Sequence, residues 1–210
     1  MATKTRLSPR RKPRQDRSRD TVEAILEAAA QIFERHGYAA GTTNRIAQRA
    51  GVSIGSLYQY FPNKDAIVME LARRHITQLR DAAWPGLEAL VEYVPPLRDG
   101  LTAIVLGTVE LHRQAPLLQR VLFEETPRSN EIRALLWELF EGANGLIGDY
   151  LAACPDVHVP DPRVAARLVT VVVDEVTHGA IIHPRDGDDP DVYARETITM
   201  LERYLTGGRT

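Results

Sequence analysis

The chain has 210 residues, of which 44% are hydrophobic and 26% charged. This composition is typical of a folded domain and unlike that of disordered or fibrous chains. No apolar run approaches the roughly 18 residues that a membrane-spanning helix needs, so we expect no membrane partner. The single cysteine, Cys154, excludes an internal disulfide and favours a reducing compartment. We therefore expect a cytoplasmic protein.

The net charge of −2 is unevenly distributed along the chain. Residues 1–64 hold twelve Lys and Arg against five Asp and Glu, a net charge of +7, whereas the remaining residues hold 14 basic and 23 acidic ones, a net charge of −9. A basic first third followed by an acidic remainder indicates a polyanion-binding module next to a domain that avoids polyanions. A solvated basic tail is the simpler alternative.

The N-terminal segment predicts a basic arm followed by a helix. Residues 1–19 contain two prolines and eight Lys and Arg but almost nothing apolar, so we expect a disordered arm there. Asp20 with Glu23 resembles a capping pair at the start of a helix. Apolar residues then recur at helical spacing from 22 to 33, and Gly37 is a natural end for that helix.

Two short helices and the start of a long one follow. The pattern predicts helices over 43–50 and 54–61, the second capped by Ser53. Pro62 ends the second helix, and Asn63 is placed to cap a long helix that begins immediately after it.

The remaining two thirds also predict helices, separated by breaks rich in Pro and Gly. The clearest covers 131–152, and shorter apolar stripes lie at 101–109 and 197–205. The segment LVTVVV at 168–173 is rich in β-branched residues, which favour a strand in isolation. Its flanks continue a helical pattern, however, and no second strand-like segment is present to pair with it. We therefore predict an all-α fold.

The helices at 43–50 and 54–61 form a helix-turn-helix unit, in which Gly51 permits the backbone conformation of the turn. The second helix of such a unit enters the major groove of DNA. Side chains with suitable donors, acceptors or methyl groups for base edges are Ile54, Gly55, Ser56 and Gln59. Those expected to reach phosphates are Thr43, Tyr58, Tyr60 and Lys64.

The stretch TTNRIAQRAGVSIGSLYQYFPNKDAI at 42–67 resembles the DNA-binding domain of the TetR family of bacterial transcriptional repressors. The residues that carry the resemblance are Thr42, Thr43, Ile46, Ala47, Ala50, Gly51, Val52, Ser53, Leu57, Tyr58, Tyr60, Phe61 and Lys64. It implies an N-terminal three-helix DNA-binding domain at 20–66 and a C-terminal helical ligand-binding and dimerisation domain at 67–210. It also suggests Asn44 as a base contact. The arginine-rich arm is longer than in many members, and either minor-groove insertion or a phosphate tether fits it.

The resemblance further implies a homodimer on a palindromic double-stranded DNA operator, with no catalytic activity and no cofactor. Members pair through their last two helices, here about 162–183 and 189–206, in a four-helix bundle. The corresponding interface candidates are Val164, Leu168, Val171, Thr197, Leu201 and Tyr204. A small-molecule effector among the C-terminal helices would change the separation of the two recognition helices and release the DNA.

One aliphatic side chain and several polar and aromatic ones of the C-terminal helices are the candidates for contacting that effector. They are Val105, Thr108, His112, Phe123, Trp137, Phe140, Asp174 and His178. Asp174 and His178 stand four residues apart, and with His183, Glu110 and His112 they also permit a metal site, although the lining of a pocket is the simpler interpretation. Responsiveness to metal or, through Cys154, to oxidants is therefore the alternative hypothesis.

Two other classes of protein would explain parts of the sequence. Residues 51–55 match G-x-S-x-G, the nucleophile motif of α/β-hydrolases, but that motif follows a buried strand, whereas RIAQRA before Gly51 is an amphipathic helical segment. Ser53 is better explained as a helix cap. A DNA-binding protein without any effector remains the other alternative, and the lack of a C-terminal cavity would favour it.

Overall fold

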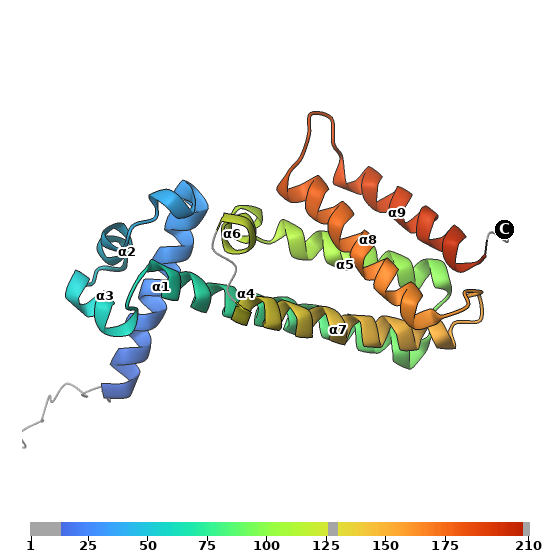
Figure 1. Cartoon of the computed structure of the whole chain (residues 1–210), viewed down its shortest axis with the longest axis horizontal. Coiled ribbons are helices and arrows are strands. Elements are labelled where there is room, and N and C mark those ends of the chain that lie inside the picture. Colours follow the sequence, from blue (N-terminus) through green and yellow to red (C-terminus); the bar gives the residue numbers. More distant parts are fainter. Residues whose placement is uncertain (1–13, 126–129, 208–210) are drawn as a thin grey trace, which may run out of the picture. The chain divides into compact units, whose positions relative to one another are not determined.

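The computed structural model describes residues 14–125 and 130–207 (Figure 1). Over these ranges every regular element is a helix, nine of them α-helices and one a short π-helical turn, and no strand occurs. The all-α prediction is confirmed. The chain divides into two compact units, one ending at Ile67 and the other beginning at Val68. Most of the predicted basic arm, residues 1–13, lies outside the described residues.

The first unit consists of α1 (Arg14–Ala40), α2 (Thr43–Ala50), α3 (Ile54–Tyr60) and the first turn of α4 (Lys64–Tyr93). Helix α1 begins six residues earlier than predicted, so Asp20 lies inside it and the predicted N-cap there is wrong. Neither Gly nor Pro interrupts the sequence between Arg14 and Asp20, and the helical pattern simply continues through the polar residues. The helix breaks at Gly37, whose φ of 70° is left-handed, as expected.

Local hydrogen bonds define the helix-turn-helix. The side chains of Thr42, Ser53 and Asn63 each accept a hydrogen bond from the backbone amide three residues later, at 3.3, 3.0 and 2.8 Å. These bonds satisfy amides that have no partner within their own helix, and they confirm the predicted caps at Ser53 and Asn63. Gly51 has φ 68°, a left-handed conformation that glycine adopts without steric cost, and ends α2.

Buried apolar side chains hold α1, α2 and α3 together. Those without exposed surface are Ile25, Ala29, Phe33, Ile46 and Leu57. They come from α1, α2 and α3, so the two helices of the motif are packed against a common support. The orientation of α3 therefore follows from core packing rather than from the turn alone.

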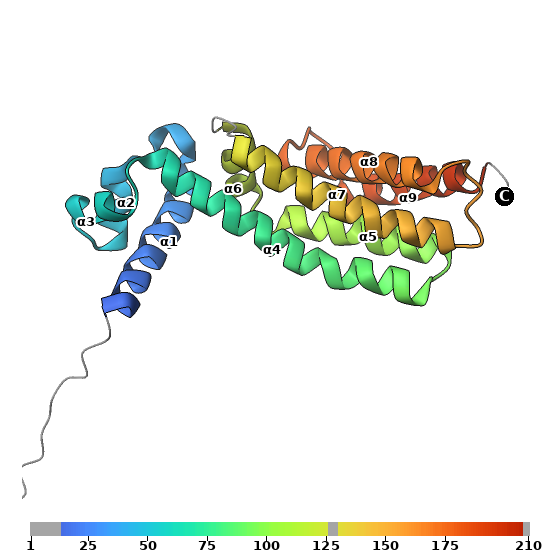
Figure 2. The same cartoon turned by 60° about the horizontal axis from the view of Figure 1, so that its bottom comes forward.

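The second unit contains the rest of α4 and six further elements. These are α5 (Leu97–Arg113), α6 (Pro116–Arg120), the π-helical turn η1 (Val121–Glu125), α7 (Asn130–Ala153), α8 (Pro162–Ile182) and α9 (Pro190–Leu205). Helix α8 packs against α7, α5 and α9, and α9 also packs against α5 (Figures 1 and 2). None of the described helices is long and apolar enough to span a bilayer.

The core of the second unit lies where α5, α7, α8 and α9 meet. Its fully buried side chains include Leu101, Val105, Tyr150, Ala165, Val169 and Leu205. Residues 168–173 are helical within α8, as predicted, because Val169 and Val173 point into this core. Burial of apolar surface contributes about 1.5–3 kcal/mol per large side chain, which exceeds the few tenths by which β-branching disfavours a helix.

Two predicted interface residues belong to the same core. Thr197 and Leu201 on α9 are only 4% and 3% exposed. They face α5 and α8 within one protomer and do not lie on its surface. The apolar spacing of α9 in the sequence marks its inward face, so it does not identify the face that remains free.

Candidate DNA-binding and effector sites

The predicted DNA-contacting residues lie on the solvent face of the helix-turn-helix. Ile54, Gly55, Tyr58 and Gln59 of α3 are exposed, whereas Leu57 between them is fully buried. Asn44 at the start of α2 is also exposed, while Thr43, Ser56, Tyr60 and Lys64 are half-buried. Helix α3 is thus anchored by one apolar residue and presents a polar and aromatic surface, which is the arrangement required of a helix that enters the major groove.

Side-chain hydrogen bonds connect the residues of this surface. The hydroxyl groups of Thr43 and Tyr58 lie 3.1 Å apart and join the start of α2 to α3. The hydroxyl groups of Ser53 and Ser56 lie 2.8 Å apart. A hydroxyl both donates and accepts, so each of these groups retains capacity for a base edge or a phosphate.

Lys64 is held by Tyr38 of α1. Its Nζ donates to the Tyr38 carbonyl oxygen at 2.8 Å and lies 3.6 Å from the centroid of the Tyr38 ring. The Tyr38 hydroxyl donates to the carboxylate of Asp65, and burial together with this contact raises the pKa of Tyr38 to about 12. An ammonium group has three donors, so Lys64 is positioned by Tyr38 and keeps N–H groups for a phosphate.

A cavity of about 650 Å³ lies within the second unit. Its wall is mostly apolar and comes from α4, α5, α7 and α8, with Leu87, Leu90, Ile104, Leu136, Phe140 and Ile147 among the lining residues. Trp84 of α4 also lines it. A volume of this size is within the range of small-molecule sites.

Six of the eight predicted effector contacts line this cavity. They are Thr108, His112, Phe123, Phe140, Asp174 and His178. Val105 and Trp137 do not line it. Val105 is fully buried in the core on the opposite face of α5, and Trp137 is 65% exposed on the outside of α7. Each of the two residues follows a lining residue, Ile104 or Leu136, by one position. One position turns a helix by about 100°, so their side chains point away from the cavity.

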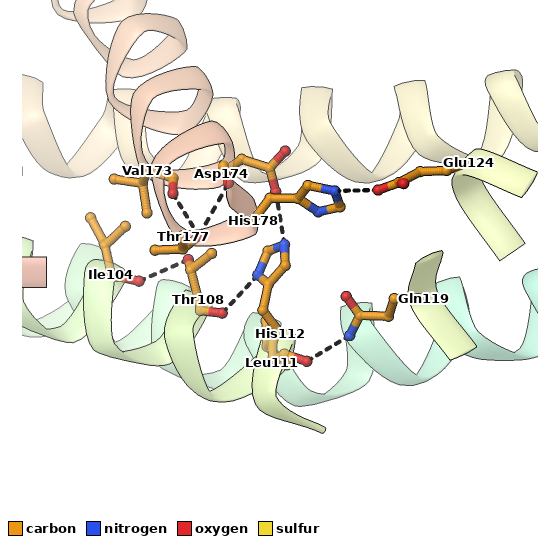
Figure 3. Close-up of polar contacts among 10 residues, drawn as sticks. All are labelled: Ile104, Thr108, Leu111, His112, Gln119, Glu124, Val173, Asp174, Thr177 and His178. Atoms are coloured by element: carbon orange, nitrogen blue, oxygen red, sulfur yellow. Dashed lines mark hydrogen bonds and ion pairs between the residues drawn. The ribbon is translucent and has the colours of Figure 1, made fainter. Parts of the chain in front are cut away.

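Polar side chains of α5, α8 and η1 contact one another, and several of them line the cavity (Figure 3). The Nδ1 of His112 lies 3.0 Å from the Thr108 carbonyl oxygen, and its Nε2 lies 3.7 Å from Oδ1 of Asp174. Because Nδ1 must donate to that carbonyl, a neutral His112 ring has no hydrogen on Nε2. Burial lowers the pKa of His112 and raises the pKa of Asp174. The pair therefore needs a shared proton, or a donor group from a bound molecule.

Beside this pair, Glu124 of η1 contacts two histidines. One of its carboxylate oxygens, Oε1, lies 2.8 Å from Nε2 of His178 and 2.8 Å from Nε2 of His183. Burial alone would raise the pKa of Glu124, but the two imidazole contacts outweigh it and lower the pKa. Sequence analysis did not select Glu124, because 54 residues separate it from His178 and no local pattern connects them.

His75 of α4 is a further buried titratable group in this unit. It is 8% exposed, its ring centroid lies 5.9 Å from that of Phe123, and its Nε2 has no hydrogen-bond partner among the described residues. Burial, with a smaller effect of the nearby His112, lowers the pKa of His75 to about 4.

Comparison with known proteins identifies the family. Residues 25–71 match the bacterial regulatory proteins of the tetR family, and residues 96–205 match the tetracyclin repressor-like C-terminal domain. The chain is 30% identical over 195 residues to the HTH-type transcriptional regulator YhgD of Bacillus subtilis. The aligned residues cover 90% of this chain and 96% of YhgD. The chain belongs to the tetR family. It is a DNA-binding transcriptional regulator and not an enzyme, and Ser53 of the G-x-S-x-G match is a helix cap.

Solved structures of other tetR-type regulators share the fold. A putative tetR-family regulator from Mesorhizobium loti superposes with a TM-score of 0.72 at 18% identity, over 91% of this chain and 98% of that one. SmeT, described as the repressor of the Stenotrophomonas maltophilia multidrug efflux pump SmeDEF, gives 0.63 at 26%, over 87% and 90%. FadR of Bacillus subtilis, solved with stearoyl-CoA, gives 0.62 at 19%, over 90% and 99%.

The exposed position of Gln59 in this tetR-family regulator leads to a prediction about specificity. We expect Gln59→Ala to relax the preference at one operator base pair by about 1–3 kcal/mol, because an amide paired with a base edge is lost. Lys64→Ala should instead weaken binding to all sequences and reduce the salt slope of the affinity by roughly one for each bound protomer. Fluorescence anisotropy with single-base operator variants at several salt concentrations measures both. Full sequence preference in Gln59→Ala would remove it from the base contacts.

The burial of His75 leads to a prediction about acid stability. Its pKa of about 4 in the folded chain lies below the ordinary 6.5, so the unfolded chain binds the proton more tightly. Stability is therefore lost as the pH falls from about 6.5 to about 4, by roughly 3 kcal/mol from this group. Urea unfolding at fixed protein concentration should show that His75→Leu loses this part of the pH dependence. The exposed His158→Leu is the control, and equal pH profiles for wild type and His75→Leu would contradict the assignment.

Proposed function

We propose that this regulator is a cytoplasmic repressor that binds a palindromic operator as a homodimer and releases it when a small molecule occupies the cavity of the second unit. The observation that carries the proposal is the cavity itself, because DNA binding alone needs only the first unit. An effector-free DNA-binding protein would have no use for 650 Å³ of largely apolar space with polar groups in its lining.

Helix α4 carries residues of both the cavity and the DNA-binding surface. It is continuous from Lys64 to Tyr93, so residues that line the cavity, such as Trp84 and Leu87, belong to the same helix as Lys64 of the helix-turn-helix unit. The half-sites of a dimer are about 34 Å apart, one turn of DNA. A ligand that displaces α4 in each protomer changes the spacing of the two recognition helices. It needs to favour a spacing that does not match the half-sites by only a few kcal/mol to release the operator.

An exposed apolar face on α8 and α9 supports the homodimer. Val164, Leu168 and Val171 on α8 lie at helical spacing and are about half exposed. Met200 and Tyr204 on α9 are exposed in the same way, and Met200 was not selected from the sequence. Two such helices from each of two protomers form a four-helix bundle when these residues are buried between them.

Replacing Leu168 tests the dimer. We expect Leu168→Glu to produce monomers, because a carboxylate on each side of the interface would be buried without a partner, while the protomer folds normally since the side chain is exposed in it. Sedimentation velocity measures the species, with Tyr93→Glu, another exposed site, as the control. Operator affinity should fall along with dimerisation, and a fully dimeric Leu168→Glu protein would contradict this interface.

The charges that line the cavity indicate the class of effector. The cavity lining contains three acidic residues, Glu110, Asp174 and Glu175, and one arginine, Arg133. An acidic lining favours an apolar molecule with an amine or another donor group, which can also satisfy the donor requirement of the His112–Asp174 pair. The anionic stearoyl-CoA bound by the Bacillus subtilis FadR matches the apolar wall but not these acids.

Filling the cavity tests the effector proposal. A Cβ added at Gly107, which lines the cavity, would meet no atom within 4 Å, so Gly107→Leu places a larger side chain at the cavity lining with room for its first carbon. The dye rhodamine 6G, an apolar cation, serves as the probe. We expect wild type to bind it more tightly than the anionic 1-anilinonaphthalene-8-sulfonate, and Gly107→Leu to lose the dye while it retains operator binding. Fluorescence titrations measure both.

The matched control is Gly145→Leu, a substitution on α7 at a position that does not line the cavity and where an added Cβ likewise meets no atom within 4 Å. It should bind the dye as wild type does. Undiminished dye binding by Gly107→Leu would show that the cavity is not the ligand site. The redox alternative has little support, because the Cys154 thiol is buried.

A further inference from the structure

Glu124, His178 and His183 form a cluster of three metal-ligating side chains, which we call the His–Glu triad. One ligand atom from each, Oε1 of Glu124 and the Nε2 atoms of the two histidines, lies within 4.8 Å of the other two. The sequence suggested Asp174, Glu110 and His112 as further metal ligands beside His178 and His183. Among the described residues, however, the third ligand atom of this cluster belongs to Glu124.

The fold places these side chains through two irregular pieces of backbone. His183 is the C-cap of α8 and has left the helical conformation, with φ −126° and ψ 54°. Its ring centroid consequently lies 5.8 Å from that of His178, five residues earlier. Glu124 comes from η1, a single π-helical turn, and such turns occur frequently at functional sites.

We propose that the His–Glu triad binds one divalent transition-metal ion of the zinc class per protomer. Two imidazole nitrogens and one carboxylate are a donor set of open zinc sites, whose fourth position is held by water or another ligand. Imidazole donors favour Zn²⁺, Ni²⁺ or Co²⁺ over Mg²⁺ and Ca²⁺, which prefer oxygen ligands.

The two distances from Glu124 to the histidines require only a small adjustment for the ion, and the ligand atoms of all three residues already lie within 4.8 Å of one another. Tetrahedral ligand atoms at about 2.1 Å from Zn²⁺ are roughly 3.4 Å apart, whereas each Nε2 is 2.8 Å from the Glu124 oxygen. The side chains must therefore separate by about half an ångström. The His183 side chain is 50% exposed and that of Glu124 27%, so neither is confined by a packed core. To bind the ion through Nε2, each imidazole ring of the triad must carry its single hydrogen on Nδ1.

The site would connect the metal to the effector cavity through His178. This residue both lines the cavity and belongs to the triad, and its ring centroid lies 5.4 Å from that of His112. The fourth position of the ion can accept water or a basic atom of a molecule in the cavity. Metal binding itself, however, needs neither the effector nor DNA.

Binding of the metal alone tests the proposal in the full-length, untagged protein. Isothermal titration with Zn²⁺ should give one ion per protomer, and Mg²⁺ should give no heat of binding. Glu124→Gln and His183→Ala should each weaken Zn²⁺ binding by about a hundredfold or more, because loss of even an indirect partner of a metal ligand costs roughly 10–100-fold. The matched controls Glu125→Gln and His158→Ala should bind Zn²⁺ as wild type does.

A measurement on the wild type keeps the test independent of how the variants fold. The X-ray absorption spectrum of the Zn²⁺-loaded protein should show two imidazole ligands and otherwise oxygen. No Zn²⁺ binding, binding that survives both triad substitutions, or a ligand set without imidazole would each overturn the proposal and leave a hydrogen-bonded triad only. Operator binding by the metal-free protein is unaffected by any of these results, so the two proposals fail separately.

Discussion

The second unit depends on the fact that α5 is buried on two faces by different partners. Leu101, Val105 and Val109 pack into the core with α8 and α9, whereas Thr108 and His112 face the cavity, and Ile104 contributes to both. The first set holds the helix in place through continuous apolar contact. The second set can consequently remain in contact with empty space and polar groups, at a cost that the core packing offsets.

This division explains why polar groups occur in the lining of the cavity. Gln119 is 4% exposed but donates to the Leu111 carbonyl at 2.9 Å, and His112 uses the Thr108 carbonyl in the same way. Each of these two buried side chains is thus satisfied by backbone of the same region, whereas Nε2 of His75 has no such partner among the described residues. The groups left over, Nε2 of His112 and the carboxylate of Asp174, face each other across 3.7 Å and give the cavity its chemical preference.

The first unit is organised by shorter-range interactions. The caps at Thr42 and Ser53 and the left-handed Gly51 each act over three or four residues, and Leu57 alone anchors α3 in the core. A helix held in this way can carry any side chains on its outer face without loss of the motif. The exposed residues of α3 are therefore free to serve DNA recognition, while the stability of the unit comes from other residues.

The sequence by itself determined the helical fold and the helix-turn-helix, because caps, a turn glycine and apolar spacing act within a few residues of one another, and the resemblance of residues 42–67 indicated the family. It also indicated six of the cavity-lining residues. Tertiary structure decided which face of each helix is buried: it places Thr197 and Leu201 inside the protomer, Val105 in the core and Trp137 in solvent. It alone brings Glu124 to His178 and His183, because contacts between residues more than 50 positions apart arise from the packing of whole helices and leave no local pattern in the chain.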